Sequence, residues 1–250
     1  MREFSYTVVL TSCGRFDLLR PTVESFLAHA DVVPARFIVI EDSGDDTVRE
    51  TLQGLGDIEV LVNPVQLGQM ASIDQAYAAV ETPYVFHCED DWTFFRGGFL
   101  AESIAILDAR ADVSMVGLRD RAEMNPLVRD LAVEQLPESA IRYVPFDPAR
   151  HPEYFSYSFN PGLRRLSDAR RFMPFAAIGG EEDISYAFKQ AGFRMATLAE
   201  PAVRHAGWER HVHDPTRAPK AKTLPQRLAR STAKRWKRLR RWWRAEAPSR

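Results

Sequence analysis

The sequence has few cysteines and no long hydrophobic segment. Its 250 residues include two cysteines, Cys13 and Cys88, which are too few for a disulfide framework and are typical of a reducing compartment. No run approaches the ~18 uninterrupted apolar residues of a membrane-spanning helix. The first residues enter a strand-like run, with no secretory hydrophobic region. We therefore expect a cytoplasmic protein with an ordinary hydrophobic core.

The sequence also carries almost no net charge, because two oppositely charged regions cancel. Residues 217–250 contain thirteen lysines and arginines and one acid, which gives a net charge of +12. Residues 1–216 contain twenty bases and thirty-three acids, which gives −13. The composition thus predicts an acidic body, residues 1–216, followed by a separate basic tail, residues 217–250.

The basic tail has the periodicity of an amphipathic helix. Apolar residues recur every three or four positions, and arginine or lysine fills most of the gaps. The stripe consists of Leu224, Leu228, Thr232, Trp236, Leu239, Trp242 and Trp243. A cationic helix with a tryptophan stripe is typical of a segment that lies on an anionic membrane. A disordered tail and a nucleic-acid-binding arm are the alternatives, and the tryptophans favour the membrane.

Strand and helix patterns alternate in the first half of the body. We expect strands at residues 6–11, 36–40, 58–62 and 84–88, and helices at residues 18–29, 46–55 and 70–80. This alternation predicts βαβ units and a mostly parallel sheet. Because crossovers are right-handed, the carboxyl ends of these strands should meet at one edge.

Acidic side chains follow two of the expected strands at that edge. Glu41 and Asp42 end one strand, and Glu89, Asp90 and Asp91 end another. Neighbouring carboxylates raise each other's pKa unless a positive charge lies among them, and a hard divalent cation is the usual remedy. The alternative is a solvated acidic turn. Since open α/β sheets bind ligands at this edge, the pattern predicts a ligand site with a metal ion.

A second acidic cluster opens a later helix. Glu181, Glu182 and Asp183 follow Gly179 and Gly180. Acids in a first turn are favoured by the helix dipole, so helix capping is one interpretation. The other is a general base that accepts a proton from a substrate hydroxyl, with the glycines allowing close approach.

The region between these clusters is less regular. Residues 119–124 and 145–152 are charged or interrupted by proline, which indicates loops. Residues 154–162 (YFSYSFNPG) alternate aromatic and polar side chains, which predicts a strand that ends in a turn. Sheet packing explains the aromatic residues; alternatively, Tyr157 and Asn160 line a substrate pocket.

Five blocks, taken in order, resemble a known family. They are residues 7–27 (TVVLTSCGRFDLLRPTVESFL), 37–47 (FIVIEDSGDDT), 67–92 (LGQMASIDQAYAAVETPYVFHCEDDW), 179–195 (GGEEDISYAFKQAGFRM) and 201–208 (PAVRHAGW). Together they resemble, over residues 5–210, the family 2-type glycosyltransferases with the GT-A fold. The resemblance implies a single Rossmann-like α/β domain with a mostly parallel sheet. Residues 1–118 would form its nucleotide-sugar half and residues 119–216 a smaller acceptor and catalytic half, followed by the basic amphipathic helix.

The resemblance also implies roles for the matching residues. The nucleotide would contact Thr11, Ser12, Arg15, Glu41, Asp42, Gly68 and Asp90. An ionised carboxylate suits a base N–H or a ribose hydroxyl because it only accepts hydrogen bonds. Asp91 would bind the metal directly, with Glu89 in place of the family's usual first Asp and His205 as the late histidine. The metal, Mn²⁺ or Mg²⁺, would bridge the diphosphate of the donor.

The implied catalytic base lies in the second acidic cluster. Alignment on Gly179 and Gly180 makes it Glu182, whereas alignment on Asp183 and the next residue makes it Glu181. Asp183 is the third catalytic candidate. The family usually has Asp at the base position, so a glutamate would move the carboxylate by one methylene. Glu182 is the first choice.

These matches imply an inverting, metal-dependent transfer of a sugar from a nucleotide-diphosphate donor. The acceptor would be a hydroxyl of a glycan or a lipid-linked molecule, as in bacterial polysaccharide biosynthesis, with the tail on the inner face of the cell membrane. One alternative is nucleotidyl transfer, although residues 12–15 match its glycine-rich loop poorly. The other is a non-catalytic module that binds nucleotide sugars or nucleic acid; we expect no nucleic acid as a partner.

Overall fold

The computed structural model describes residues 4–210, 212–216, 223, 229, 231–233, 235–239 and 241. The chain divides into two compact units, Met1–Asp214 and Pro215–Arg250. In the second unit, the described residues between 229 and 241 are helical, and Trp236 and Leu239 are exposed. The other apolar stripe positions except Thr232 lie outside the described residues. None of the helices in the described part of the chain has the length and apolar character of a membrane span.

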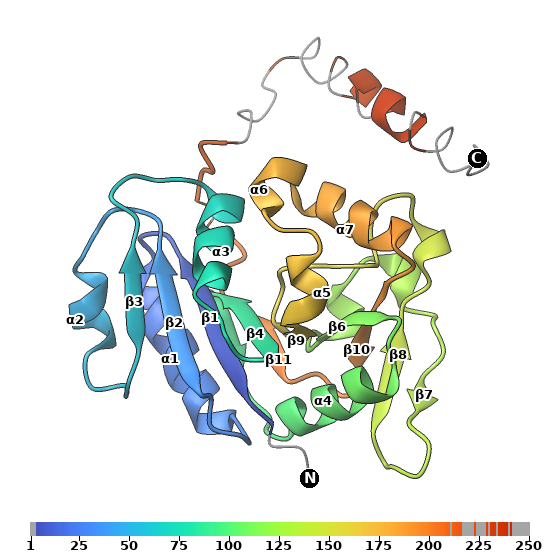
Figure 1. Cartoon of the computed structure of the whole chain (residues 1–250), viewed down its shortest axis with the longest axis horizontal. Coiled ribbons are helices and arrows are strands. Elements are labelled where there is room, and N and C mark those ends of the chain that lie inside the picture. Colours follow the sequence, from blue (N-terminus) through green and yellow to red (C-terminus); the bar gives the residue numbers. More distant parts are fainter. Residues whose placement is uncertain are drawn as a thin grey trace. The chain divides into compact units, whose positions relative to one another are not determined.

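The first unit is built on a nine-stranded sheet with the order β3-β2-β1-β4-β9-β6-β10-β8-β7 (Figure 1). Its strands are β1 (Tyr6–Ser12), β2 (Arg36–Glu41), β3 (Glu59–Val62), β4 (Tyr84–Glu89), β6 (Val113–Gly117), β7 (Glu134–Gln135), β8 (Arg142–Pro145), β9 (Gly162–Arg165) and β10 (Arg194–Leu198). Strands β1 to β4 are parallel neighbours, and β6 is parallel to β10. Strand β9 runs antiparallel between β4 and β6. The expected α/β architecture with a mostly parallel sheet is confirmed.

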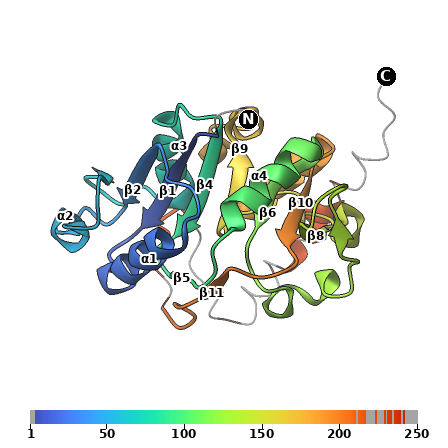
Figure 2. The same ribbon diagram turned by 90° about the horizontal axis from the view of Figure 1, so that it is seen from below.

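Helices cover both faces of this sheet (Figures 1 and 2). One face carries α1 (Phe16–His29), α2 (Val48–Leu52) and α4 (Phe99–Ala109), and the other carries α3 (Gln69–Ala78), α5 (Leu166–Arg170), α6 (Phe175–Ile178) and α7 (Glu181–Gln190). The alternation of β1 explains the two cores, because Val8 and Leu10 pack with Phe26 of α1, whereas Val9 packs with Tyr77 of α3. The central strands of the sheet are therefore buried on both sides.

Two sequence-based expectations differ from the structure. The helix expected at residues 46–55 is shorter in the structure, where α2 has only five residues, and Gly54 follows it with a φ of +83°. The strand expected at residues 154–159 is wrong, because the neighbouring strand β9 begins at Gly162. Tyr157 is nevertheless buried and stacks on Phe188 of α7, with ring centroids 4.1 Å apart. Packing under the helices, not strand pairing, explains the aromatic pattern.

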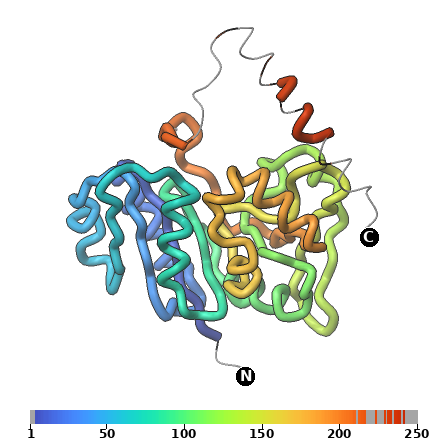
Figure 3. Tube along the Cα trace, turned by 45° about the horizontal axis from the view of Figure 1, so that its top comes forward, coloured from blue at the N-terminus to red at the C-terminus, as the bar shows by residue number. Residues whose placement is uncertain are grey.

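Two long-range arrangements position the carboxyl-end edge of the sheet. A small ribbon pairs β5 (Trp92–Phe94) with β11 (Val203–His205), and its register places His205 opposite Trp92 (Figure 2). On the other face, α3 and α6 lie side by side (Figure 3). The carboxylate of Asp74 on α3 accepts hydrogen bonds from the N–H groups of Phe175 and Ala176, which fixes the segment that leads into α7.

Candidate active site

Arg15 binds two of the three acids that follow β4. Its Nη1 donates to Asp91 Oδ2 at 2.7 Å, its Nε donates to Asp90 Oδ2 at 3.3 Å, and its Nη2 donates to the other oxygen of Asp90. Asp90 is fully buried, and this burial raises its pKa to about 6 although Arg15 acts in the opposite direction. An arginine of the chain thus supplies the positive charge that the sequence analysis assigned to a metal. Repulsion among these acids does not by itself require a metal ion.

Asp91 also lies close to His205, and the binding of a metal by these two residues stays a prediction. Its Oδ2 lies 3.4 Å from His205 Nε2, and its Oδ1 is buried without a hydrogen-bond partner among the described residues. Burial lowers the pKa of His205, although Asp91 opposes this shift, and the neutral imidazole is the form that binds metals. Gly207 lies against the same carboxylate, and a Cβ at that position would come within 2.8 Å of Oδ2.

Glu89 lies within electrostatic reach of both Asp91 and Glu181 of the second acidic cluster. Its side chain accepts hydrogen bonds from Gln69 Nε2 at 3.1 Å and from Trp92 Nε1 at 3.3 Å. Burial raises the pKa of Glu89 to about 8, and the negative charges of Asp91 and Glu181 add to the shift. The shift shows that the acids after β4 and those at the start of α7 lie within electrostatic reach of each other.

Glu41 and Asp42 bind backbone amides around the same edge. Glu41 Oε1 accepts hydrogen bonds from the N–H groups of Gly14 at 2.9 Å and Ser43 at 2.8 Å. Asp42 Oδ2 accepts from the N–H of Gly68 at 2.8 Å, where a φ of +91° favours glycine. Both acids therefore hold together the turns after β1 and β2 and the start of α3. Their contact with a nucleotide stays a prediction.

The other residues implied as nucleotide contacts end β1. Thr11 pairs in register with Glu89 of β4, and Ser12 pairs with Glu41 of β2. The Ser12 side chain is buried at this edge. The structure thus brings Thr11, Ser12, Arg15, Glu41, Asp42, Gly68 and Asp90 to one edge of the sheet.

Glu181 points toward this edge from the first turn of α7. It accepts hydrogen bonds from Ser158 Oγ at 3.3 Å and from the Phe159 N–H at 3.4 Å. Its charge raises the pKa of Glu89 and acts on Arg119 in the same direction. Glu181 therefore lies within electrostatic reach of Glu89 and Arg119.

The next two acids make different contacts. Glu182 Oε2 accepts a hydrogen bond from the Tyr154 hydroxyl at 3.3 Å. The carboxylate of Asp183 lies against Gly179, where a Cβ would come within 2.6 Å of Oδ2. Gly179 has a φ of +131°, so its glycine is required both by the backbone and by this close approach. Asp183 thus packs back on the turn that begins the helix.

Arg119 is a further site residue that the sequence analysis did not identify. It follows β6, and its guanidinium carbon lies 5.2 Å from the ring centroid of Trp92 and 6.0 Å from that of Trp208. Its Nη1 donates to Asn160 Oδ1 at 3.3 Å, and its buried Nε has no partner among the described residues. Burial lowers the pKa of Arg119, while nearby acids oppose the shift. No local pattern distinguishes this arginine from the other charged residues of its loop.

A cavity of about 250 Å³ opens beside these groups. Arg119 and Glu181 line it together with Tyr157 and Asn160, the two residues that the sequence analysis suggested for a pocket. Among the described residues, at this site or elsewhere, no group of three or more His, Cys, Asp or Glu side chains is arranged to hold a metal ion. Protein ligands alone would therefore not complete a coordination sphere.

The sequence and the fold agree on the class of protein. Residues 7–160 match the family model of glycosyl transferase family 2, and the chain belongs to this family. Its fold is the GT-A fold, as the sequence resemblance implied. A comparison with curated proteins gave no significant match.

Solved structures with this fold are similar in shape and distant in sequence. A mannosyltransferase, PcManGT from Pyrobaculum calidifontis in complex with GDP-Man and Mn²⁺, has a TM-score of 0.60 and 12% identity, over 82% of this chain and 57% of that one. TarS 1-349 of S. aureus in complex with UDP-GlcNAc has a TM-score of 0.59 and 15% identity, over 86% and 62%. Glucosyl-3-phosphoglycerate synthase from Mycobacterium tuberculosis, in complex with Mn²⁺, UDP and glucosyl-3-phosphoglycerate, has a TM-score of 0.52 and 12% identity, over 81% and 72%. The chain thus spans about three fifths of the length of the first two.

Proposed function

We propose that this glycosyltransferase moves a sugar, with inversion, from a nucleotide-diphosphate donor to an acceptor hydroxyl, and that a divalent metal assists. The observation that carries the proposal is geometric: Arg15 gathers Asp90 and Asp91 at the sheet edge, and the cavity lined by Glu181 shares Arg119 with this site, since Arg119 lies over Trp92. A donor-side carboxylate and a base candidate thus lie close enough to act on the two ends of one reaction. Solved relatives of this fold were obtained with GDP-Man and Mn²⁺ and with UDP-GlcNAc, which supports such a donor.

Asp91 and His205 are the residues that would hold the metal. Asp91 offers a buried oxygen that has no partner among the described residues, and His205 lies 3.4 Å from the same carboxylate. Mg²⁺ is usually held by one or two carboxylates plus substrate phosphates, so a site with few protein ligands is the expected kind. Glu89, the third metal candidate from the sequence, lies within electrostatic reach of Asp91. The metal would neutralise charge on the diphosphate as it leaves.

Arg15 and the polar residues around it would hold the nucleotide part of the donor. Arg15 can exchange its bond with Asp91 for the diphosphate, while its two bonds with Asp90 keep it in place. The carboxylates of Glu41 and Asp42 would accept hydrogen bonds from the base or ribose, beside Thr11, Ser12 and Gly68.

Glu181 is the base that we favour in this reaction. It lines the cavity, and it is held by Ser158 and the Phe159 N–H. It would accept the proton of the acceptor hydroxyl as that oxygen attacks the anomeric carbon from the side opposite the diphosphate. Glu182, the first choice from the sequence, points to Tyr154 and is the alternative, and Asp183 packs on Gly179.

A panel of nucleotide sugars tests this function. Incubated with Mn²⁺ and the full chain, one donor is expected to release its nucleoside diphosphate by transfer or slow hydrolysis, and a chelator should stop the release. Nucleotidyl transfer would instead release pyrophosphate from a nucleoside triphosphate and a sugar phosphate. A binding module would release neither product, and either of these last two results would contradict the proposal.

We further propose that the tail holds the enzyme on an anionic membrane, where a lipid-linked or glycan acceptor of polysaccharide synthesis would lie. Each Lys or Arg near such a surface contributes about 1 kcal/mol, decaying within ~10 Å at 0.1 M salt. The tail carries +12, and Trp236 is 62% exposed. Salt should therefore weaken binding without abolishing it, because burial of tryptophan is not screened.

Deletion of residues 217–250 is expected to release the protein from vesicles that contain anionic lipid. Activity on a soluble acceptor should change little. Co-sedimentation of the full-length and truncated proteins, at low and high salt, measures this effect, and neutral vesicles are the control. Equal sedimentation of the two forms would contradict a membrane role. Tight binding of duplex DNA without vesicle binding would identify the tail as a nucleic-acid arm.

A further inference from the structure

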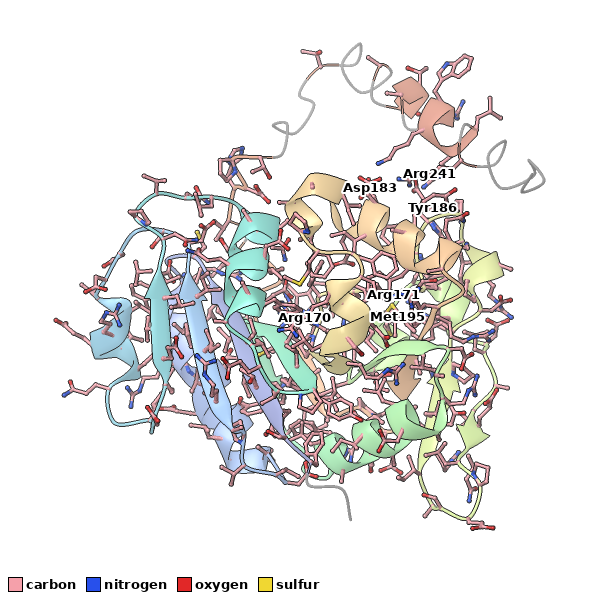
Figure 4. All side chains as sticks on the ribbon, viewed as in Figure 1. Arg170, Arg171, Asp183, Tyr186, Met195 and Arg241 are labelled. Atoms are coloured by element: carbon pink, nitrogen blue, oxygen red, sulfur yellow. The ribbon has the colours of Figure 1, made fainter. Side chains whose placement is uncertain are left out.

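The cavity beside Glu181 has an apolar wall. The smallest of the three hydrophobic clusters of the described residues forms this wall, through Met115, Val128, Phe146, Phe155 and Met195. Figure 4 labels Met195 among the side chains beneath α7. These residues come from β6, β10, the short 3-10 helix Pro126–Val128 and two loops, and all are buried. The wall does not belong to the two cores that hold the helices on the sheet.

Four other residues that line the cavity form a polar cluster linked by hydrogen bonds: Arg119, Asn160, Ser158 and Glu181. Arg119 also lies over Trp92 of the candidate active site. The Nε of Arg119 is buried without a partner among the described residues, so it can donate to an oxygen of a bound molecule. The cavity therefore has an apolar end and a hydrogen-bonding end, and the hydrogen-bonding end contains the proposed base.

Size and polarity restrict what fits the apolar end. An apolar cavity of about 150 Å³ is enough to bind benzene, so 250 Å³ accommodates a six-membered ring or a short alkyl chain with its attached hydroxyl. A second sugar ring would place several hydroxyl groups against methionine and phenylalanine side chains. Each buried hydroxyl without a hydrogen bond is costly, so a sugar is disfavoured at this end.

We propose that the acceptor carries a compact apolar group next to its nucleophilic hydroxyl, and that the cavity binds this group. The inference rests on the proposed function, because it takes Glu181 as the group that faces the hydroxyl. Methionine side chains at the wall adapt to irregular shapes, which suits an aryl or short alkyl group. Burial of the group would hold the hydroxyl at Glu181 and exclude water, which competes with the acceptor for the donor sugar.

Binding of simple alcohols without a donor tests the wall separately from sugar transfer. The probes are 1-butanol, 1-pentanol, 1-hexanol and benzyl alcohol, with glycerol as a polar control, in NMR or calorimetric titrations of the full chain. Affinity should rise about threefold to fourfold for each added methylene until the cavity is full, since each buried methylene is worth that factor. Flat affinity along the series, or equal binding of glycerol, would overturn the proposal even if the enzyme transfers sugar. Tight binding of the alcohols by a chain that transfers no sugar would leave the wall intact and reject the proposed function.

Gly117 offers a substitution that fills the cavity. It lines the cavity at the end of β6, and a Cβ there would lie 3.7 Å from Ala196 O and 3.8 Å from Thr197 Oγ1, which are ordinary contacts. Gly117→Val should lower the affinity for 1-hexanol at least tenfold and leave donor binding unchanged, with Gly117→Ala as the smaller matched control. Met124→Gln is the second variant, for use if Gly117→Val fails to fold. Met124 is half-buried, lines the cavity and packs against the wall, so this change should lower the affinity for 1-hexanol several-fold. Full affinity for 1-hexanol in both folded variants would overturn the assignment of this cavity.

Discussion

Replacement of Asp91 with asparagine is expected to abolish metal-dependent donor binding and to leave the fold intact. The change removes the charge of the proposed metal ligand at nearly constant shape. Arg15 would keep its bonds to Asp90, so the turn before α1 stays in place. Loss of an outer-sphere partner alone typically costs 10–100-fold in metal affinity, so loss of a direct ligand should cost more than about 100-fold.

Calorimetric titration of UDP and of GDP, each with and without Mn²⁺, measures this effect. Asp57→Asn, the same chemical change at an exposed turn, is the matched control and should bind like the parent protein. A melting curve of Asp91→Asn should stay close to that of the parent. Unchanged Mn²⁺-dependent affinity in the folded variant would remove Asp91 from the metal site.

The edge of the sheet was predictable because local patterns determine it. β1, β2 and β4 are short apolar runs that end in polar turns, and a parallel sheet brings such ends together. This rule alone gathers Ser12, Glu41 and Glu89, and the register of β1 with its neighbours confirms their proximity.

The partners of these residues were not predictable from local patterns. Arg15 and Asp90 are 75 positions apart, and nothing in either segment indicates that the arginine turns inward. The sequence therefore suggested a metal as the remedy for repulsion where the fold supplies a guanidinium. Arg119 lies in an irregular loop, and its position depends on two tryptophans from other parts of the chain.

The aromatic run at residues 154–159 shows a different limit. Alternation of aromatic and polar residues predicts a strand when one face is buried against a sheet. Here Tyr157 and Phe159 are buried under α6 and α7 without pairing to a strand. An irregular segment can therefore show the same alternation as a strand. The cavity wall is even harder to predict from the sequence, because its side chains come from five segments that share no pattern.

Replacement of Glu181 with glutamine is expected to lower turnover by about 10²–10⁴-fold and to leave donor affinity unchanged. A general base contributes a factor of this size, and glutamine keeps the hydrogen-bonding shape but cannot take a proton. Single-turnover rates and donor titrations of Glu181→Gln, Glu182→Gln and Asp183→Asn separate the three acids. Glu182→Gln should retain most of its turnover, because its contact is with Tyr154. An inactive Glu182→Gln beside a normal Glu181→Gln would make Glu182 the base, and normal turnover in all three would place the base elsewhere.

The three substitutions also test whether the cluster only caps α7. Removal of one negative charge from the first turn of a helix costs about 0.3–1 kcal/mol of stability, and this cost should be similar for all three acids. A 10²–10⁴-fold loss of turnover corresponds to about 2.7–5.4 kcal/mol of activation free energy. Helix capping is too weak to produce a loss of that size, and it would not single out one acid. A large loss confined to one folded variant that binds its donor normally therefore identifies a proton transfer at that side chain.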